Sequence, residues 1–303
     1  MMRAVITLSA AAIVVSLTGC PRPLTAPARV TETNVVALRK AFGGDQTAAG
    51  PAKAAPEPTG WATFKGVVKL NGTPPAPTTL TVTSDHAVCA PGGRPVYAND
   101  LVVGADGGIK NVVVYLTTKY PEGDPAWEHP DVVAAADAPQ PFDQKECVFL
   151  TRVFTMRSTA VLTILNSDPV GHNTNISGGG GAAPFNGTIP SGGRATYTPG
   201  GESSEPFGVS CSIHPWMAAY GIVRKSPYFA VTDENGQFEL KNVPAGVPLE
   251  FRIWQEKSRF LGEAEITGGA FDKFNKGRLN LQLDPDETRE LVFVAPAKLF
   301  GGN

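Results

Sequence analysis

The chain has 303 residues, enough for two domains of ordinary size, and its formal net charge is −2. No cluster of lysine and arginine accompanies that charge, which argues against a nucleic-acid partner. The 33 glycines and 27 prolines, together with segments rich in valine and phenylalanine, predict an all-β protein with many turns.

Residues 1–19 have the features of a signal peptide. Arg3 precedes an apolar run of 14 residues, Ala4 to Leu17, which is too short to span a bilayer comfortably. The sequence Leu-Thr-Gly-Cys that ends at Cys20 resembles the lipobox of bacterial lipoproteins. That resemblance implies cleavage before Cys20 and lipidation of the cysteine. An ordinary signal peptide with a coincidental cysteine is the alternative.

The expected location is the bacterial cell envelope, with the chain lipid-anchored to a membrane and either facing the periplasm or on the outer membrane. Pro21 stands where the inner-membrane retention signal of lipoproteins has aspartate, which favours the outer membrane in a Gram-negative cell. Residues 20–60 are rich in proline and alanine and are expected to form a tether. Within the tether, Val35, Leu38 and Phe42 share one face of a predicted short amphipathic helix.

A β segment is expected over residues 61–107. Apolar and polar residues alternate from Phe64 to Leu70, and Asn71-Gly72 closes this strand with a turn. Two more strands are predicted at Leu101–Val103 and Val112–Leu116. The second has no polar alternation, so we expect it inside a sandwich. Residues 117–145 are rich in proline and acidic residues and predict a long surface excursion, with His129 as a solvated loop residue.

Consecutive strands are predicted beyond residue 147, and they bring two polar loops to one end of a sandwich. One loop runs from Asn166 to His172, and the other begins at Cys211. Loops at one pole of a rigid β-sandwich commonly carry function. The predicted strands are Cys147–Met156, Val161–Leu165, a strand within Thr188–Tyr197, Phe207–Cys211 and Tyr220–Lys225.

The second loop contains Cys211, His214 and Met217, at spacings of three residues. Histidine and methionine are each 4 of 303 residues, so a given cysteine has a chance of roughly 0.0002 of showing both spacings. Thiolate, imidazole and thioether together form the ligand set that selects copper in a trigonal site with a weak axial methionine. His172 provides the further imidazole that such a site requires.

These two segments resemble the cupredoxin (blue copper) family, and the Cys-x2-His-x2-Met loop is most similar to that of the amicyanins, with plastocyanins as related members. The resemblance covers roughly residues 108–225 and implies a cupredoxin-like Greek-key β-sandwich with one type 1 copper. It implies that His172, Cys211 and His214 bind the metal in a plane and that Met217 is a long axial contact.

The same resemblance implies that Asn173 ties the two ligand loops together through Ser212. Gly171 departs from the proline often found in the family before the first histidine, and Gly178–Gly181 form an unusual glycine run. Trp216 is expected either to lie beside the site, where it could present apolar surface to a redox partner, or to pack in the core.

Of the four cysteines, Cys20 and Cys211 are accounted for by lipid and metal. Cys89 and Cys147 remain, and in an oxidising compartment such a pair tends to form a disulfide. Closing this loop would stabilise the fold by about 4 kcal/mol in the chain-entropy model. Two buried free thiols are the alternative.

Residues 226–297 are expected to form a second, smaller β domain. Its turn at Asp233–Gly236 and the following Val243–Gly246 pattern resemble carboxypeptidase regulatory-like domains, which are prealbumin-like β-sandwiches without catalysis of their own. The opening strand of that family is similar to Phe64–Pro75, so residues 61–107 are expected either to precede the copper domain or to join this second one. Hairpins are predicted around residues 233–236 and around residues 284–286.

Three functions can be weighed from these features. The first is a membrane-anchored electron carrier with a redox partner protein in the envelope. The second is a non-redox copper-binding or structural protein: a copper buffer, a sensor, or an adhesion or docking module. The third, an oxidase, would need further histidine clusters, which four histidines cannot supply. We therefore expect no enzyme activity.

Overall fold

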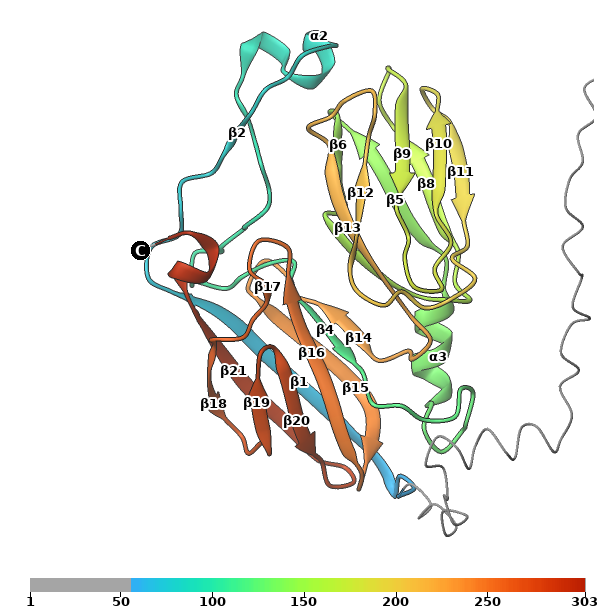
Figure 1. The fold of residues 1–303 in the computed structure, drawn as a ribbon, viewed down its shortest axis with the longest axis vertical. Coiled ribbons are helices and arrows are strands. Elements are labelled where there is room, and N and C mark those ends of the chain that lie inside the picture. The colour runs from blue at the N-terminus through green and yellow to red at the C-terminus, as the bar shows by residue number, and fades with distance from the viewer. Residues whose placement is uncertain (1–55, 303) are drawn as a thin grey trace, which may run out of the picture. The chain divides into compact units, whose positions relative to one another are not determined.

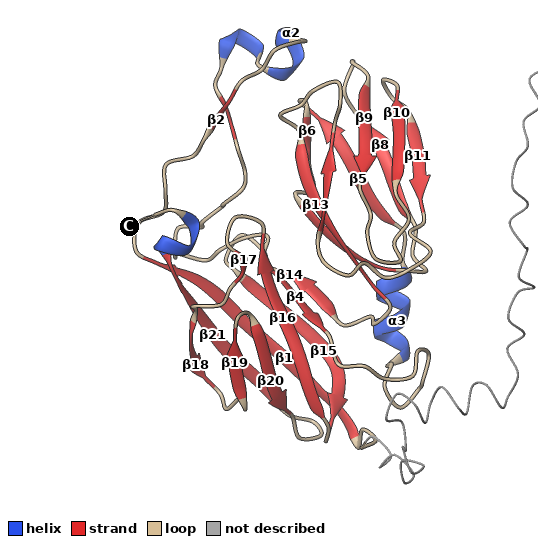
Figure 2. Ribbon diagram, viewed as in Figure 1, coloured by secondary structure: helices blue, strands red, loops and turns tan. Residues whose placement is uncertain are grey.

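The computed structural model describes residues 56–302. The predicted signal peptide, Cys20 and the predicted tether helix lie outside the described residues. The prediction of an all-β protein is confirmed, because strands β1 to β21 account for most of the regular structure in the described range (Figure 2). Its helices are short: α2 (His86–Cys89), α3 (Pro130–Asp137), and the 3-10 turns η1 (Pro91–Gly93) and η2 (Ala297–Phe300).

No helix in residues 56–302 combines the length and the apolar character that crossing a membrane would require.

Strands β5 to β13 form what we call the inserted sandwich, because they lie between β4 and β14 in the sequence (Figure 1). One of its sheets has the order β10-β9-β12-β13-β7, and the other has the order β11-β8-β5-β6. Aromatic and aliphatic side chains from both sheets share one core, in which Phe142, Met156 and Leu162 are fully buried. The strands are β5 (Gln140–Lys145), β6 (Val148–Phe149), β7 (Val153–Arg157), β8 (Leu162–Asn166), β9 (His172–Ile176), β10 (Phe185–Ile189), β11 (Arg194–Tyr197), β12 (Phe207–Ser210) and β13 (Ala218–Arg224).

The remaining large sheets form the terminal sandwich, with the orders β15-β1-β21-β18 and β14-β4-β16-β20-β19. Its core is separate and includes Phe64, Phe251 and Phe293, all fully buried. The strands are β1 (Gly60–Asn71), β4 (Val113–Leu116), β14 (Phe229–Val231), β15 (Gln237–Ala245), β16 (Pro248–Gln255), β17 (Arg259–Phe260, paired with β16), β18 (Glu265–Gly268), β19 (Lys273–Asn275), β20 (Arg278–Gln282) and β21 (Thr288–Pro296).

The strand β1 joins the terminal sandwich, where it pairs antiparallel with β15 and parallel with β21. Its side chains alternate between buried and partly exposed, as the period-two pattern predicts. The strand β4 pairs with β14 and β16. Its four residues are all buried, as expected, but they belong to the terminal sandwich and not to a copper domain that starts at residue 108.

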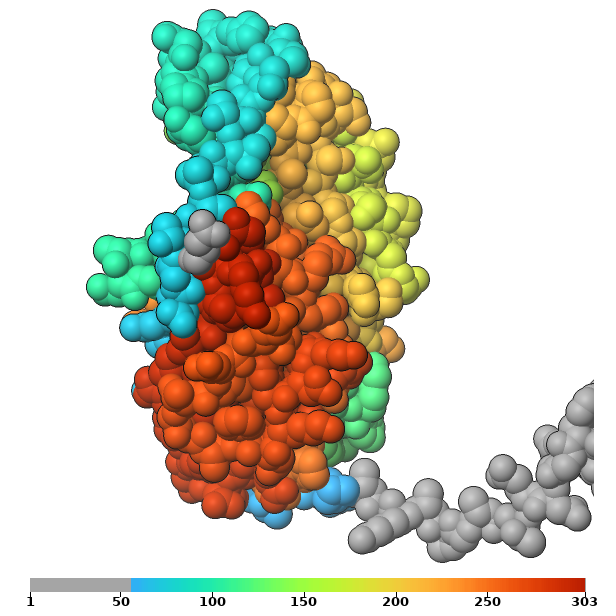
Figure 3. Space-filling model, turned by 60° about the vertical axis from the view of Figure 1, so that its left-hand side comes forward, coloured from blue at the N-terminus to red at the C-terminus, as the bar shows by residue number. Residues whose placement is uncertain are grey.

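A long connection between β1 and β4 forms what we call the strap, residues 73–100. It contains β2 (Thr79–Leu80), α2, η1 and β3 (Val96–Tyr97), and in the described chain β2 and β3 pair only with each other. Figure 3 shows the strap, in cyan, against the amber segments of the inserted sandwich. The two are joined covalently, because Cys89 and Cys147 form a disulfide with a Cα–Cα distance of 5.0 Å.

Several local predictions are wrong in an instructive way. The turns at residues 233–236 and 284–286 are present, but neither closes a hairpin: each joins strands of different sheets in the terminal sandwich. The excursion at residues 117–145 contains helix α3 and strand β5. Its His129 is the N-cap of α3, where its Nδ1 accepts a hydrogen bond from the Asp131 amide at 3.2 Å. Finally, Leu101–Val103 forms only an isolated bridge between Val103 and Ile109.

Candidate metal centre

The loops at one end of the inserted sandwich bring the predicted ligands together. His172 begins β9, and Cys211 directly follows β12. The ligand loop between β12 and β13 is closed by its own backbone, because the Met217 amide donates to the His214 carbonyl at 2.9 Å and the Cys211 amide donates to the Met217 carbonyl at 3.4 Å. A tight loop of this kind holds the three side chains at the same pole.

Three of the four predicted ligands converge on one point. Donor atoms of His172, Cys211 and His214 all lie within 4.8 Å of one another. The two Nδ1 atoms of the imidazoles face each other at 2.9 Å. Both imidazoles are fully buried, and Cys211 is 3% exposed. Met217, 1% exposed, packs in the same hydrophobic cluster as Cys211.

Two backbone amides point at the sulfur of Cys211. The amide of Asn173 donates to Sγ at 3.3 Å and that of His214 donates at 3.4 Å. Burial raises the pKa of the Cys211 thiol, but the hydrogen bonds from His172 and from the backbone outweigh burial and lower the pKa to about 7. The site therefore favours the thiolate, which is the form that binds metals.

His172 is held from the side opposite to its Nδ1. Its Nε2 lies 2.6 Å from Oδ2 of Asp168, which is itself 4% exposed. Burial lowers the pKa of His172, but interactions with Cys211 and Asp168 outweigh it and leave the pKa raised. Asp168 also accepts hydrogen bonds from the amides of Glu146 and Cys147, at 2.6 and 2.8 Å. The carboxylate thus orients the imidazole and supports the β5–β6 turn, whose two central residues both have positive φ.

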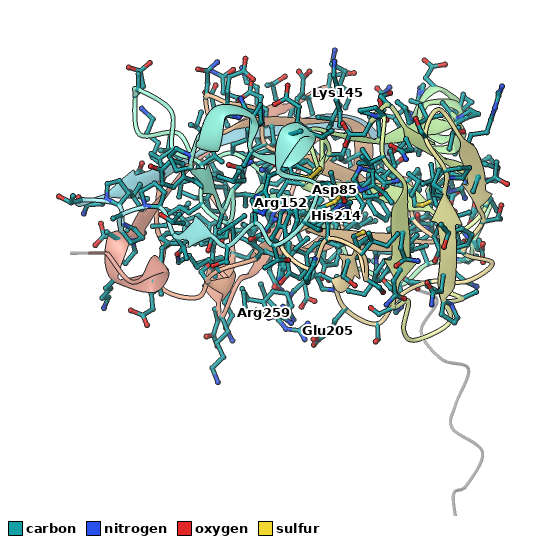
Figure 4. The ribbon with its side chains drawn as sticks, turned by 90° about the horizontal axis from the view of Figure 1, so that it is seen from above. Asp85, Lys145, Arg152, Glu205, His214 and Arg259 are labelled. Carbon is teal, nitrogen blue, oxygen red and sulfur yellow. A yellow bond between two sulfur atoms is a disulfide. The ribbon has the colours of Figure 1, made fainter. Side chains whose placement is uncertain are left out.

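His214 has a matching arrangement with a partner from the strap. Its Nε2 lies 2.8 Å from Oδ2 of Asp85, a residue 129 positions earlier in the sequence (Figure 4). The Trp216 ring lies 5.1 Å from the His214 ring, and its indole nitrogen donates to the Cys147 carbonyl at 3.1 Å. Each imidazole is therefore anchored through Nε2 by a carboxylate, which leaves Nδ1 for the shared point between them.

Asn173 links the two ligand loops in the way that the cupredoxin resemblance implies. Its side-chain Oδ1 accepts a hydrogen bond from the Ser212 backbone amide at 3.2 Å. Its side-chain Nδ2 donates to Oδ1 of Asn186 and to the Gly187 carbonyl. Together with the hydrogen bond that its backbone amide donates to Cys211 Sγ, this side chain fixes the distance between the start of β9 and the Cys211 loop.

Sequence reasoning missed the two carboxylates. Asp168 stands four residues before His172, and that spacing is a local signal from which the pairing could have been suspected. Asp85 carries no such signal, because only the fold of the strap brings it to His214. In addition, the Asn166 side chain donates to the carbonyls of Val170 and Ile189 and so shapes the loop that leads to His172.

The donor set fits a copper ion. One thiolate-favouring cysteine and two imidazoles with converging Nδ1 atoms are ligands of the softness that copper prefers, and a buried thioether lies in the same loop. Hydrogen bonds from Asp168, Asp85 and Asn173 hold these side chains and loops in place, which favours a preorganised site.

No protein-family model and no curated protein matches the chain. Among solved structures, the chain is similar to amicyanin from Paracoccus versutus (Thiobacillus versutus), with 19% identity over 37% of this chain and 97% of amicyanin and a TM-score of 0.25. It is also similar to the Cu-containing nitrite reductase from Thermus scotoductus SA-01, with 20% identity, a TM-score of 0.26 and coverage of 28% of this chain. The chain spans 22% of that reductase.

Proposed function

We propose that the inserted sandwich binds one type 1 copper ion through His172, Cys211, His214 and Met217, and that the protein is an electron carrier. The observation that carries this proposal is the convergence of two anchored imidazoles and one thiolate-favouring cysteine at a buried point. When bound, the copper ion supplies one-electron exchange between Cu(I) and Cu(II).

The residues around the ligands support electron transfer by limiting movement. Asp168 and Asp85 hold the imidazoles, and Asn173 holds the two loops together. A site whose ligands are held in the same way in both oxidation states loses little energy to reorganisation. Burial of both imidazoles also keeps water away from the site, and it favours outer-sphere electron exchange over substrate binding.

The proposal places the protein in the bacterial cell envelope, lipid-anchored through Cys20, with a redox protein as its partner. It assigns no catalytic residue, so the protein would carry electrons without turning over a substrate. The terminal sandwich, whose sequence resembles carboxypeptidase regulatory-like domains, would serve as a scaffold or docking surface.

The test is the visible absorption spectrum of the full chain loaded with Cu(II). We expect an intense blue thiolate-to-copper band at one copper per chain. The band should vanish in Cys211→Ser and persist in His129→Ala, a matched control that removes a histidine outside the site. Reversible loss and recovery of the band on chemical reduction and reoxidation, without copper release, would support the electron carrier.

A colourless protein that binds no stoichiometric copper, and whose copper uptake His172→Ala leaves unchanged, would refute the copper site. A blue protein that loses its copper on reduction would instead favour a copper buffer or sensor. Circular dichroism of each variant establishes that the change in the spectrum does not come from unfolding.

A further inference from the structure

A second set of metal-binding side chains lies beside the first. Donor atoms of Cys89, Cys147 and His214 all lie within 4.8 Å of one another, and all three residues are buried. The two cysteines form a disulfide in this structure, so their sulfurs are not free to bind a metal. The disulfide nevertheless lies directly beside His214, a predicted copper ligand. A disulfide that only joined the strap to the sandwich would not need to lie next to an imidazole.

We propose that reduction of the Cys89–Cys147 disulfide creates a second metal site, formed by the two thiolates, His214 and Asp85. The proposal goes beyond the electron-carrier function, although both sites use His214. The metal would be a soft or borderline d10 ion, Cu(I) or Zn(II), because two thiolates with an imidazole are the donors that these ions prefer.

The two sites approach His214 from different sides. Its Nδ1 faces His172, whereas its Nε2 points to the strap and contacts Asp85 at 2.8 Å. The Asp85 side chain is 40% exposed, whereas His214 is fully buried. An ion can therefore reach the site from the solvent side of Asp85. Asp85 would thereby be the oxygen donor at the outer edge of the second site.

The reduction step has a defined balance. A dithiol reductant supplies two electrons and two protons, the S–S bond breaks, two cysteine thiols form, and the reductant becomes a disulfide. Metal binding then displaces the two thiol protons, because thiolates are the ligands. The sulfurs must separate to about 3.8 Å, the spacing that metal–sulfur bonds of about 2.3 Å give in a tetrahedral site.

The strap carries one of the two sulfurs and has few polar links to the inserted sandwich. Its strands pair only with each other in the described chain, and it carries Cys89. Besides the disulfide, its polar links to the inserted sandwich are the Asp85–His214 contact and an exposed ion pair between Arg94 and Glu146. Cys147, by contrast, lies in the β5–β6 turn of the inserted sandwich, where its backbone amide donates a hydrogen bond to Oδ2 of Asp168 at 2.8 Å. Cys89 is buried, and Val82 and Val88 of the strap pack against the same core, so the strap stays in place after reduction and only the Cys89 side chain has to turn away from Cys147.

The experiment uses the full chain carrying Cys211→Ser, which removes the thiolate of the first site. The protein is reduced with dithiothreitol, freed of it under anaerobic conditions and titrated with Co(II), a spectroscopic probe for Zn(II) sites. We expect one equivalent of Co(II) with thiolate-to-metal charge-transfer absorption, displaced by Zn(II). The oxidised protein should show no such band.

The matched control is the double variant Cys89→Ser with Cys211→Ser, which also lacks the disulfide and therefore has a comparable fold stability. It should lose the charge-transfer band, whereas Asp85→Ala in the Cys211→Ser background should weaken binding by about 10- to 100-fold. Every variant keeps Cys20, so any metal bound there is common to all. Alkylation of the thiols, slowed by Zn(II) only in the reduced Cys211→Ser protein, gives a second readout.

The proposal is overturned if reduced Cys211→Ser, folded by circular dichroism, takes up no Co(II), or if the double variant binds it equally with the same absorption. Neither result bears on the blue band of the oxidised wild-type chain. Failure of the second site and failure of the first are therefore distinguished.

Discussion

The two sandwiches of this chain share an architecture but use their buried polar side chains differently. In the terminal sandwich, Thr232 bonds to the backbone at Ile109 and Val112, and its role ends with the satisfaction of main-chain groups. At one pole of the inserted sandwich, buried side chains bond to each other: His172 contacts both Asp168 and His214. At this pole the buried side chains orient one another, whereas Thr232 satisfies only main-chain groups.

The largest effect on stability is expected from a core truncation in the terminal sandwich, which tests whether that sandwich is independent of the metal site. Phe251 is fully buried and its ring lies 5.0 Å from that of Phe64. Phe251→Ala should lower the free energy of unfolding by about 3–5 kcal/mol, because it removes apolar contacts and leaves a cavity. Denaturant unfolding measures the loss. The blue band of the folded copper form should be unchanged, and a shifted band would show that the two sandwiches are coupled.

Removal of the Asp168 carboxylate, which contacts His172, should lower the free energy of unfolding by less than the core truncation does and should lower the affinity for copper more. Asp168→Ala leaves two amides and the His172 Nε2 without their acceptor, which should cost about 2–3 kcal/mol. Copper affinity should fall by about 10- to 100-fold, because the imidazole loses its orienting partner. Competition with a chelator measures the affinity. Asp131→Ala, a control that removes an exposed carboxylate in the first turn of α3, should leave the affinity unchanged.

The smallest effect is expected for the link between the two loops. Asn173→Ala removes the hydrogen bond to the Ser212 amide and those to Asn186 and the Gly187 carbonyl, and it should lower the free energy of unfolding by about 1–2 kcal/mol. Its spectroscopic effect should be visible nonetheless, since the distance between His172 and the Cys211 loop is no longer held. An unaltered copper spectrum would show that the backbone alone sets that distance.

Local patterns in the sequence predict most of the strands and also the loop residues Cys211, His214 and Met217, but not the carboxylates of Asp85 and Asp168. Period-two alternation marks β1, and the spacing of Cys211, His214 and Met217 marks a loop that the structure closes with its own backbone. The signal is local in both cases, because a strand face and a short loop are set by neighbouring residues.

Features that depend on distant partners could not be predicted in this way. The turn at 233–236 has the composition of a hairpin, but β14 pairs with β4 and β15 pairs with β1, so the turn joins two sheets. The contact between Asp85 and His214 depends on how the strap crosses to the other sandwich. Turn chemistry fixes a change of direction, whereas sheet membership is decided by long-range packing.

The placement of β1 has a consequence for the order in which the two sandwiches fold. This strand pairs with β15 and β21, and both partners follow the whole inserted sandwich in the sequence. The inserted sandwich draws its strands from one continuous stretch, residues 140–224, and has far lower contact order. It can therefore fold first, while β1 waits unpaired with an exposed apolar face, and a chain in this state is prone to aggregate.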